Sequence, residues 1–285
     1  MKILLLISIG AVFGQQLDFL NHGKPVLDAH NCYPYEGQWA DRIDRALKLG
    51  FPVAIEQDIA WAKGRPVVSH TSKTRGDEPA LREHFFERVR PIVERALKEN
   101  DRAKWPIIVL HFDFKSLEPE TLRGVWEVLG EYQDWITTAE QTADPHVLAS
   151  FQKKPLLVLT EDADIQEEIF FKGLKKGERL RVFGSAHTAK IEGTREERVH
   201  LMATLPAEKL LVDRPTNFRR WWNNSWYEVE EGGQTKAGDW TAADDARLRE
   251  LVNRAHSLGY WIRFYTLDGF SESENRGWEA GYNFG

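Results

Sequence analysis

Short apolar segments alternate with amphipathic segments along most of the chain. The apolar segments are rich in Val, Ile, Leu and Phe, and several end in polar residues, which is typical of buried strands. They span residues 26–30, 53–61, 106–115, 155–160, 181–186, 209–213 and 260–266. Between them, apolar residues recur at helical spacing, most clearly over residues 39–49, 79–99, 121–137 and 242–258. This alternation predicts a parallel sheet that is buried on both faces.

Seven strand-and-helix steps in a chain of 285 residues predict an α/β fold of the TIM type. In such a (β/α)₈ barrel the site lies at the carboxyl ends of the strands. An open doubly wound sheet is the competing architecture, but no glycine-rich phosphate loop follows the first strand. Residues 15–285 contain no linker and no low-complexity segment, so we expect a single barrel domain.

The end of the chain is short for this fold. After the last predicted strand only residues 270–285 remain, which are too few for a further helix and an eighth strand. Either the barrel is open or the sequence is a truncated copy. We favour truncation, because an open barrel would expose unpaired backbone groups on its first and seventh strands.

Two acids in the second predicted strand carry the first indication of chemistry. Glu56 and Asp58 are two residues apart, so their side chains project from the same face of the strand. Two carboxylates placed side by side repel one another. A divalent cation between them would remove the repulsion, since Mg²⁺ and Ca²⁺ take oxygen ligands.

Further polar residues follow the neighbouring strands. His30 ends the first strand, His70 lies in the loop after the second, and Asp113 and Lys115 end the third. Carboxyl ends of parallel strands meet at one edge of a sheet, so these residues are expected to converge with Glu56. Three carboxylates would hold one Mg²⁺ or Ca²⁺, and two histidines would exchange protons near neutral pH as base and acid.

Three other polar residues near the strand ends have more than one interpretation. His111 either lines the site or fills the barrel interior, and we favour filling. Glu161 and Asp162 end the fourth strand and would reach the metal or cap the next helix, with capping by Asp162 the favoured reading.

The ordered set of motifs resembles the PLC-like phosphodiesterase superfamily. The motifs are His30-Asn31, Glu56-x-Asp58, Val67-Val68-x-His70 and Asp113-x-Lys115. The similarity is greatest to the glycerophosphodiester phosphodiesterases and to a bacterial and fungal branch whose first motif reads Ala-His-Asn. It extends from Leu27 to about Gly269, where residues 263–269 look like the seventh strand of that branch.

The resemblance implies a distorted TIM barrel and a metal-dependent phosphoric diester hydrolase. Its substrate would be a glycerophosphodiester or a phospholipid-type diester. The family pattern makes His30 and His70 the proton-transfer pair and Lys115 a contact to the phosphate. Glu56, Asp58 and Asp113 would be the metal ligands.

The chain departs from the glycerophosphodiesterase pattern after the first histidine. Asn31 and Cys32 stand where those enzymes have Arg and Gly, so a phosphate contact made by that arginine is absent. Asn31 is expected to bind substrate instead, because its amide donates a hydrogen bond to phosphate or ligates a metal through its oxygen.

Aromatic residues near the sixth predicted strand suggest two rival functions. Trp222, within Arg219-Arg220-Trp221-Trp222, and Trp226 would be exposed and would cage a choline-like cation or stack on a sugar ring, unless they form a packed loop. A sphingomyelinase D-like or phospholipase D-like lipid hydrolase would use this cluster. The rival from another class is a non-catalytic barrel that binds phosphorylated or sugar ligands.

Composition and the first residues bear on location and partners. The formal net charge is −6, which gives no reason to expect nucleic acid. Residues 1–14 contain one lysine, a short apolar run and small residues before Gln15, which predicts a secretory signal peptide more than a buried first element. The mature chain would have no transmembrane segment. Cys32 is the only cysteine, and export without a disulfide favours a bacterial periplasm or medium. The oligomeric state is left open.

Overall fold

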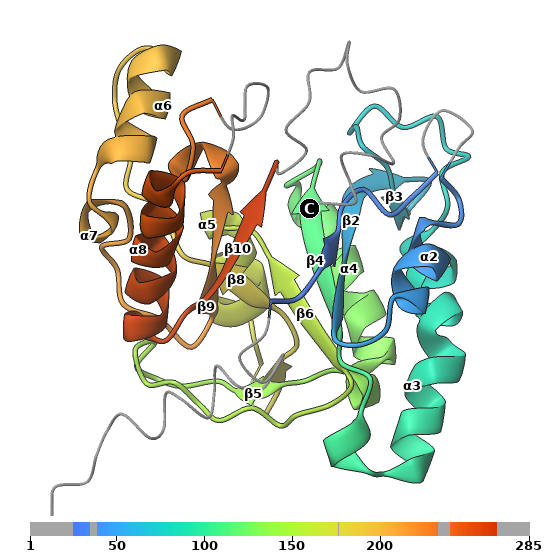
Figure 1. The fold of residues 1–285 in the computed structure, drawn as a ribbon. Helices are drawn as coiled ribbons and strands as arrows, with labels where there is room; N and C mark the ends of the chain where they lie inside the picture. The colour runs from blue at the N-terminus through green and yellow to red at the C-terminus, as the bar shows by residue number, and fades with distance from the viewer. Residues whose placement is uncertain (1–24, 35–38, 176, 233–239, 267–285) are drawn as a thin grey trace, which may run out of the picture.

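A curled parallel sheet flanked by helices forms the centre of the computed structural model, which describes residues 25–34, 39–175, 177–232 and 240–266 (Figure 1). Its parallel strands follow the order β1-β2-β4-β6-β8-β9-β10. They are β1 (Asp28–Ala29), β2 (Val53–Ala62), β4 (Ile108–Phe114), β6 (Leu156–Thr160), β8 (Phe183–Ser185), β9 (Arg219–Ser225) and β10 (Trp261–Tyr265). The sheet forms part of a barrel, with β1 and β10 as its outermost described strands.

Helices connect most of these strands and cover the outside of the sheet. They are α2 (Arg42–Lys48), α3 (Glu87–Glu99), α4 (Pro119–Glu131), α5 (Asp164–Glu167), α6 (Arg195–Thr204), α7 (Ala207–Leu210) and α8 (Ala242–Leu258). Short π-helical turns, η1 (Arg82–Phe86) and η4 (Glu168–Lys172), adjoin α3 and α5, and η2 (Arg102–Lys104), η3 (Gln133–Trp135) and η5 (Trp226–Glu228) are 3₁₀ turns. Among the described residues, no helix has both the length and the apolar character needed to cross a bilayer.

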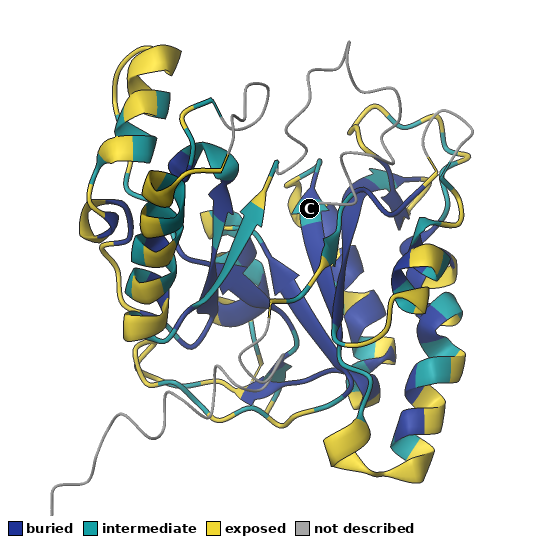
Figure 2. Ribbon diagram, viewed as in Figure 1, coloured by how far each residue is buried: buried dark blue, intermediate teal, exposed yellow. Residues whose placement is uncertain are grey.

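Burial follows the sheet. Figure 2 shows the strands largely buried and the outer faces of the helices exposed. One apolar cluster lies between the first strands and helices α3 and α4, and includes Ile55, Val93 and Leu122. A second packs under α8 and includes Trp222 and Leu251. The alternation of strands and helices predicted from the sequence is therefore confirmed for most of the chain, whereas the described residues form part of a barrel with seven parallel strands rather than a closed eight-stranded one.

One predicted strand is wrong. The predicted strand over residues 209–213 overlaps the short helix α7 at residues 207–210. The sixth parallel strand of the sheet is instead β9, which contains the Arg-Arg-Trp-Trp run. The pattern concealed this strand because two arginines lie inside it. Arg220 is 3% exposed and donates hydrogen bonds to the backbone oxygens of Ala149 and Asn217, so the guanidinium is satisfied within the core.

A hairpin follows the second large strand. β3 (Arg65–Val68) pairs antiparallel with β2 through a two-residue turn, in which Lys63 and Gly64 have φ of 49° and 75°. Positive φ at both central positions is the requirement of a tight hairpin turn, and glycine adopts it without strain. The Ser69 amide then donates a 3.0 Å hydrogen bond to the Asp58 carbonyl. The hairpin thus returns the chain to β2 and places His70 near Asp58.

An ion pair joins the two outermost described strands. Arg263 of β10 contacts Asp28 of β1, and its guanidinium also lies 3.4 Å from the Glu56 carboxylate. Exposed fractions of 13% and 14% make the Arg263–Asp28 pair largely buried. Side chains, rather than a ladder of backbone hydrogen bonds, therefore connect these two edges.

Two predicted features lie outside the described residues. They are the signal peptide, residues 1–14, and the end of the chain, residues 270–285.

We predict that Arg263→Met lowers the free energy of unfolding by about 3–5 kcal/mol, because it leaves Asp28 without its buried counter-charge. The matched control is Arg249→Met, which removes an exposed i,i+4 pair with Asp245 and should cost less than about 1 kcal/mol. Chemical denaturation followed by tryptophan fluorescence measures both. Equal losses in the two variants would contradict a structural role for the buried pair.

Candidate metal centre

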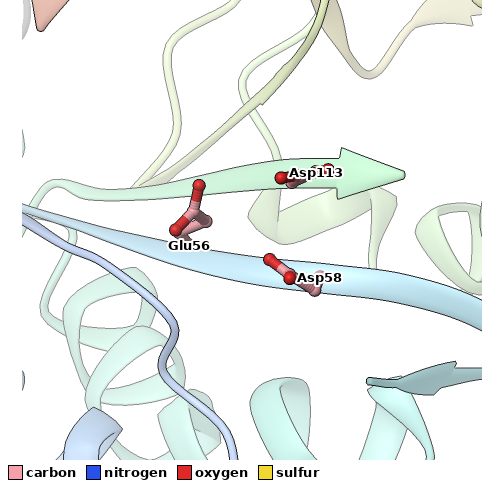
Figure 3. Close-up of side chains that lie close together, drawn as sticks. All are labelled: Glu56, Asp58 and Asp113. Atoms are coloured by element: carbon pink, nitrogen blue, oxygen red, sulfur yellow. The ribbon is translucent and has the colours of Figure 1, made fainter. Parts of the chain in front are cut away.

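Three carboxylates converge at the carboxyl ends of two adjacent strands. Glu56 and Asp58 share one face of β2, and the parallel register places Asp58 directly opposite Asp113 of β4. Each acid contributes an oxygen that lies within 4.8 Å of the others. Figure 3 shows Glu56 and Asp58 along β2 and Asp113 on the neighbouring strand. The period of two and the parallel register are together sufficient to bring these side chains together.

Two of the three acids are buried, and few positively charged side chains lie beside them. Glu56 is 2% exposed and Asp58 is fully buried. Burial, and next the charges of Glu56 and Asp113, raise the pKa of Asp58 to about 8. Burial also raises the pKa of Glu56. Buried carboxylates of this kind either retain protons or require a cation.

The donor set fits a hard divalent cation. Asp58 Oδ1 is buried and has no hydrogen-bond partner among the described residues. Unsatisfied carboxylate oxygens and the absence of sulfur ligands in the cluster are the features that Mg²⁺ or Ca²⁺ requires. The cluster can therefore hold a metal ion, although it does not distinguish one hard cation from the other.

The two predicted histidines lie against different acids of the cluster. His30 follows β1, and its Nε2 is 3.1 Å from Glu56 Oε2. His70 follows the hairpin, and its Nε2 is 3.9 Å from Asp58 Oδ2. With exposed side-chain fractions of 35% and 51%, both are reachable from solvent. Partial burial, and next the Lys115 charge, lower the pKa of His70, so the neutral imidazole is favoured near pH 7.

Lys115 supplies positive charge beside two of the acids. Its Nζ lies 2.6 Å from Asp113 Oδ2 and 3.0 Å from Asp58 Oδ2. The Lys115 amide also donates a 2.8 Å hydrogen bond to the Ile59 carbonyl, which fixes the backbone just after β4. The ammonium therefore lies at the border of the acid cluster.

Asn31 connects the first loop to the acids. Its φ is 51°, in the left-handed region that Asn tolerates better than most residues, and its amide donates a 3.0 Å hydrogen bond to Glu56 Oε2. The side-chain oxygen lies 2.7 Å from the Tyr33 hydroxyl oxygen. Cys32 is buried. Asn31 therefore belongs to the site, and its contact with substrate stays a prediction.

Sequence reasoning missed two members of the site. The Tyr33 hydroxyl donates a 2.8 Å hydrogen bond to Asp58 Oδ2, and Arg263 contacts Glu56 from the last described strand. Tyr33 lies in a loop, where no periodicity fixes its direction. Arg263 did leave a signal, because a charged residue between Ile262 and Phe264 in a predicted apolar strand favours an acidic partner.

Trp221 and Trp222 are not exposed, contrary to expectation, and Trp226 is half-buried. Trp222 is fully buried and its Nε1 donates a 2.9 Å hydrogen bond to Thr188 Oγ1. Trp221 is 1% exposed and donates to the Thr160 carbonyl. The predicted substrate contact through an exposed Trp222 ring is therefore wrong, because the run is a central strand whose rings pack on both faces.

Two smaller expectations have opposite outcomes. His111 is 2% exposed and packs edge-on against Trp221, so it fills the interior as expected, and its Nδ1 also lies 3.6 Å from Glu56 Oε1 at the border of the acid cluster. Asp162 does not cap α5, whose N-cap position is Ala163 and lacks a side-chain cap. Its Oδ2 lies 3.5 Å from His187 Nδ1 instead.

Comparison with known proteins adds no family. No family model, no curated protein and no solved structure matches this chain. The resemblance to the PLC-like phosphodiesterases therefore rests on the ordered motifs.

We predict that, in a chelator, the melting temperature falls as the pH rises from about 5 to about 9. The pKa of Asp58 is raised on folding to about 8, so its stabilising proton is fully held below the unfolded pKa and is lost as the pH rises through 8. Saturating Mg²⁺ or Ca²⁺ should remove the decline, because the cation replaces the proton. Thermal unfolding by circular dichroism measures it.

Asp58→Asn should flatten this pH dependence, and the control Asp134→Asn, an exposed residue of η3, should leave it unchanged. A decline that persists undiminished in Asp58→Asn would assign it to other groups.

Proposed function

We propose that this protein is a metal-dependent phosphoric diester hydrolase on a barrel of the TIM type, acting on a glycerophosphodiester or phospholipid-type substrate. The observation that carries the proposal is the cluster of the buried Glu56 and Asp58 with the half-buried Asp113, each of which offers an oxygen within 4.8 Å of the others. Histidines on two sides and a lysine at its edge supply the other groups that phosphodiester hydrolysis needs.

The three acids would hold one divalent cation, Mg²⁺ or Ca²⁺. When bound, such a cation neutralises charge on the phosphate and on the transition state. Tyr33 and the Asn31 amide keep Asp58 and Glu56 oriented through hydrogen bonds of 2.8 and 3.0 Å. These donors bind carboxylate oxygens directly and restrict how the acids turn.

His30 and His70 would form the proton-transfer pair. One imidazole takes a proton from the attacking oxygen as the new P–O bond forms. The other gives a proton to the leaving alcohol oxygen as the old P–O bond breaks. Their placement against different acids and their exposure to solvent support this division.

Lys115 and Asn31 would contact the phosphate. Lys115 lies between two acids, and a cation that neutralised those acids would leave its ammonium available to a phosphate oxygen. Export to a bacterial periplasm or medium remains part of the proposal, because a secreted phosphodiesterase would meet its substrates there.

We predict hydrolysis of a generic phosphodiester reporter that depends on Mg²⁺ or Ca²⁺ and is abolished by chelator. His30→Ala should lower kcat/KM by about 10²–10⁴-fold, as loss of general acid-base catalysis does. Glu56→Ala should abolish both turnover and metal binding. The control is His256→Ala, an exposed histidine in the last turn of α8. Normal turnover by purified His30→Ala or Glu56→Ala would refute the mechanism.

Lys115→Met should separate metal binding from turnover. Its ammonium competes for Asp58 and Asp113, so removing it should tighten divalent cation binding roughly tenfold, a repulsion of about 1.4 kcal/mol. Turnover should still fall, because the phosphate loses a charged contact. Calorimetry with the metal alone and steady-state kinetics provide the two readouts.

The matched control for Lys115→Met is Lys172→Met, an exposed lysine paired with Glu168. Weaker cation binding in Lys115→Met would show that the lysine supports the cation site rather than competing with it.

A further inference from the structure

A cavity of about 300 Å³ opens beside the acid cluster, near the carboxyl ends of the later strands. Its volume lies at the lower end of the range for small-molecule sites. The residues that matter here are Glu161, Asp162, Met202, Asn223, Glu228 and Tyr265. None of them is among the proposed metal ligands or proton-transfer residues. The cavity is therefore separate from the candidate metal centre, although both lie at the carboxyl ends of the strands.

The cavity shares a wall with the acid cluster. Asn223 Oδ1 accepts a 3.1 Å hydrogen bond from Arg263, whose guanidinium also contacts Glu56. The same guanidinium lies 5.8 Å from the centre of the Tyr265 ring. A group in this cavity would therefore be one residue away from the candidate metal centre.

Glu228 is the unusual residue of the cavity. It is 2% exposed, and its Oε2 has no hydrogen-bond partner among the described residues. Burial raises its pKa to about 8, so the carboxyl keeps its proton near neutral pH until a cation beside it favours the ionised form. The nearby guanidinium of Arg247 is committed to other acceptors, the Glu228 backbone carbonyl and the Glu250 carboxylate. A buried carboxylate oxygen left without a donor at a cavity wall is costly, and a ligand that donates a hydrogen bond would remove that cost.

The charge around the cavity selects among possible donors. Glu161, Asp162 and Glu228 contribute three carboxyl groups, and Arg198 is the cation among the described lining residues. Arg198 donates a hydrogen bond to the Gly193 carbonyl at the exposed side. A hydroxyl would donate a hydrogen bond to Glu228 Oε2 but would bring no positive charge to the acids. A quaternary ammonium would compensate the acids and carry no N–H for Oε2. A primary ammonium does both.

We infer that this cavity binds the primary ammonium of the substrate's head group, with Glu228 as the direct acceptor. The identification of the ammonium as part of a phosphodiester rests on the proposed function of the neighbouring centre. Binding itself can be measured without turnover.

The test is calorimetric titration of the full chain in chelator with three esters that share one glycerophosphate moiety: glycerophosphoethanolamine, glycerophosphocholine and glycerophosphoglycerol. The ethanolamine ester should bind at least roughly tenfold more tightly than the other two, because it alone donates a charged hydrogen bond to Glu228. Equal affinities, or no binding of the ethanolamine ester, would overturn the inference.

Glu228→Gln should remove this preference, whereas Glu196→Gln, an exposed acid in the first turn of α6, should retain it. Should Glu228→Gln fail to fold, Met202→Trp provides a second variant, since a larger side chain from α6 would fill the cavity and should weaken binding of the ethanolamine ester at least roughly tenfold. An unchanged preference in a folded Glu228→Gln or Met202→Trp variant would place the ammonium elsewhere.

Turnover separates this inference from the proposed function. With Mg²⁺ or Ca²⁺ added, selective binding of the ethanolamine ester without hydrolysis would remove the enzymatic proposal and leave the binding site standing. Hydrolysis of all three esters with equal kcat/KM would support the enzyme and overturn the head-group site.

Discussion

Acidic side chains outnumber basic ones at the carboxyl ends of the strands, and much of this structure depends on that imbalance. Among the described residues there, Arg263 contacts two carboxylates and Lys115 contacts two others. The acids lie close together in a poorly solvated region, where unpaired charge is expensive. The surrounding chain responds by directing donors at carboxylate oxygens: the amide of Asn31 and the hydroxyl of Tyr33 both come from the loop after β1. The local backbone, including the left-handed Asn31, is therefore arranged around anionic oxygens.

Much of the acid cluster could be predicted from the sequence, because it depends on strand periodicity and on parallel pairing. Glu56 and Asp58 face the same way in any strand, and parallel pairing of consecutive apolar segments brings Asp113 alongside. The flanking histidines follow from the same rule, since each lies just beyond a strand. What the sequence could not supply was the direction of side chains in loops, as with Tyr33.

The strand that contains Trp222 was concealed for a different reason. Its neighbour Arg220 is buried in a position that hydrophobic patterns assign to exposed loops. The guanidinium is acceptable there because the carbonyl oxygens of Asn217 and Ala149 accept hydrogen bonds from it, and Ala149 is 71 residues away in the sequence. Long-range partners of this kind are fixed by the tertiary fold and leave no local signal. Glu228 illustrates the same limit, because its burial depends on how the segment after β9 packs.

Arg263 has a consequence for how the two edges of the sheet communicate. Its guanidinium contacts Asp28 on β1 and Glu56 in the acid cluster at the same time. A cation that binds Glu56 competes with Arg263 for the same carboxylate. Such binding would therefore change how strongly the guanidinium interacts with Asp28. By linkage, the free energy by which cation binding changes the contact between β1 and β10 equals the free energy by which that contact changes cation affinity. The contact between β1 and β10 and cation binding at the acid cluster are thus thermodynamically coupled.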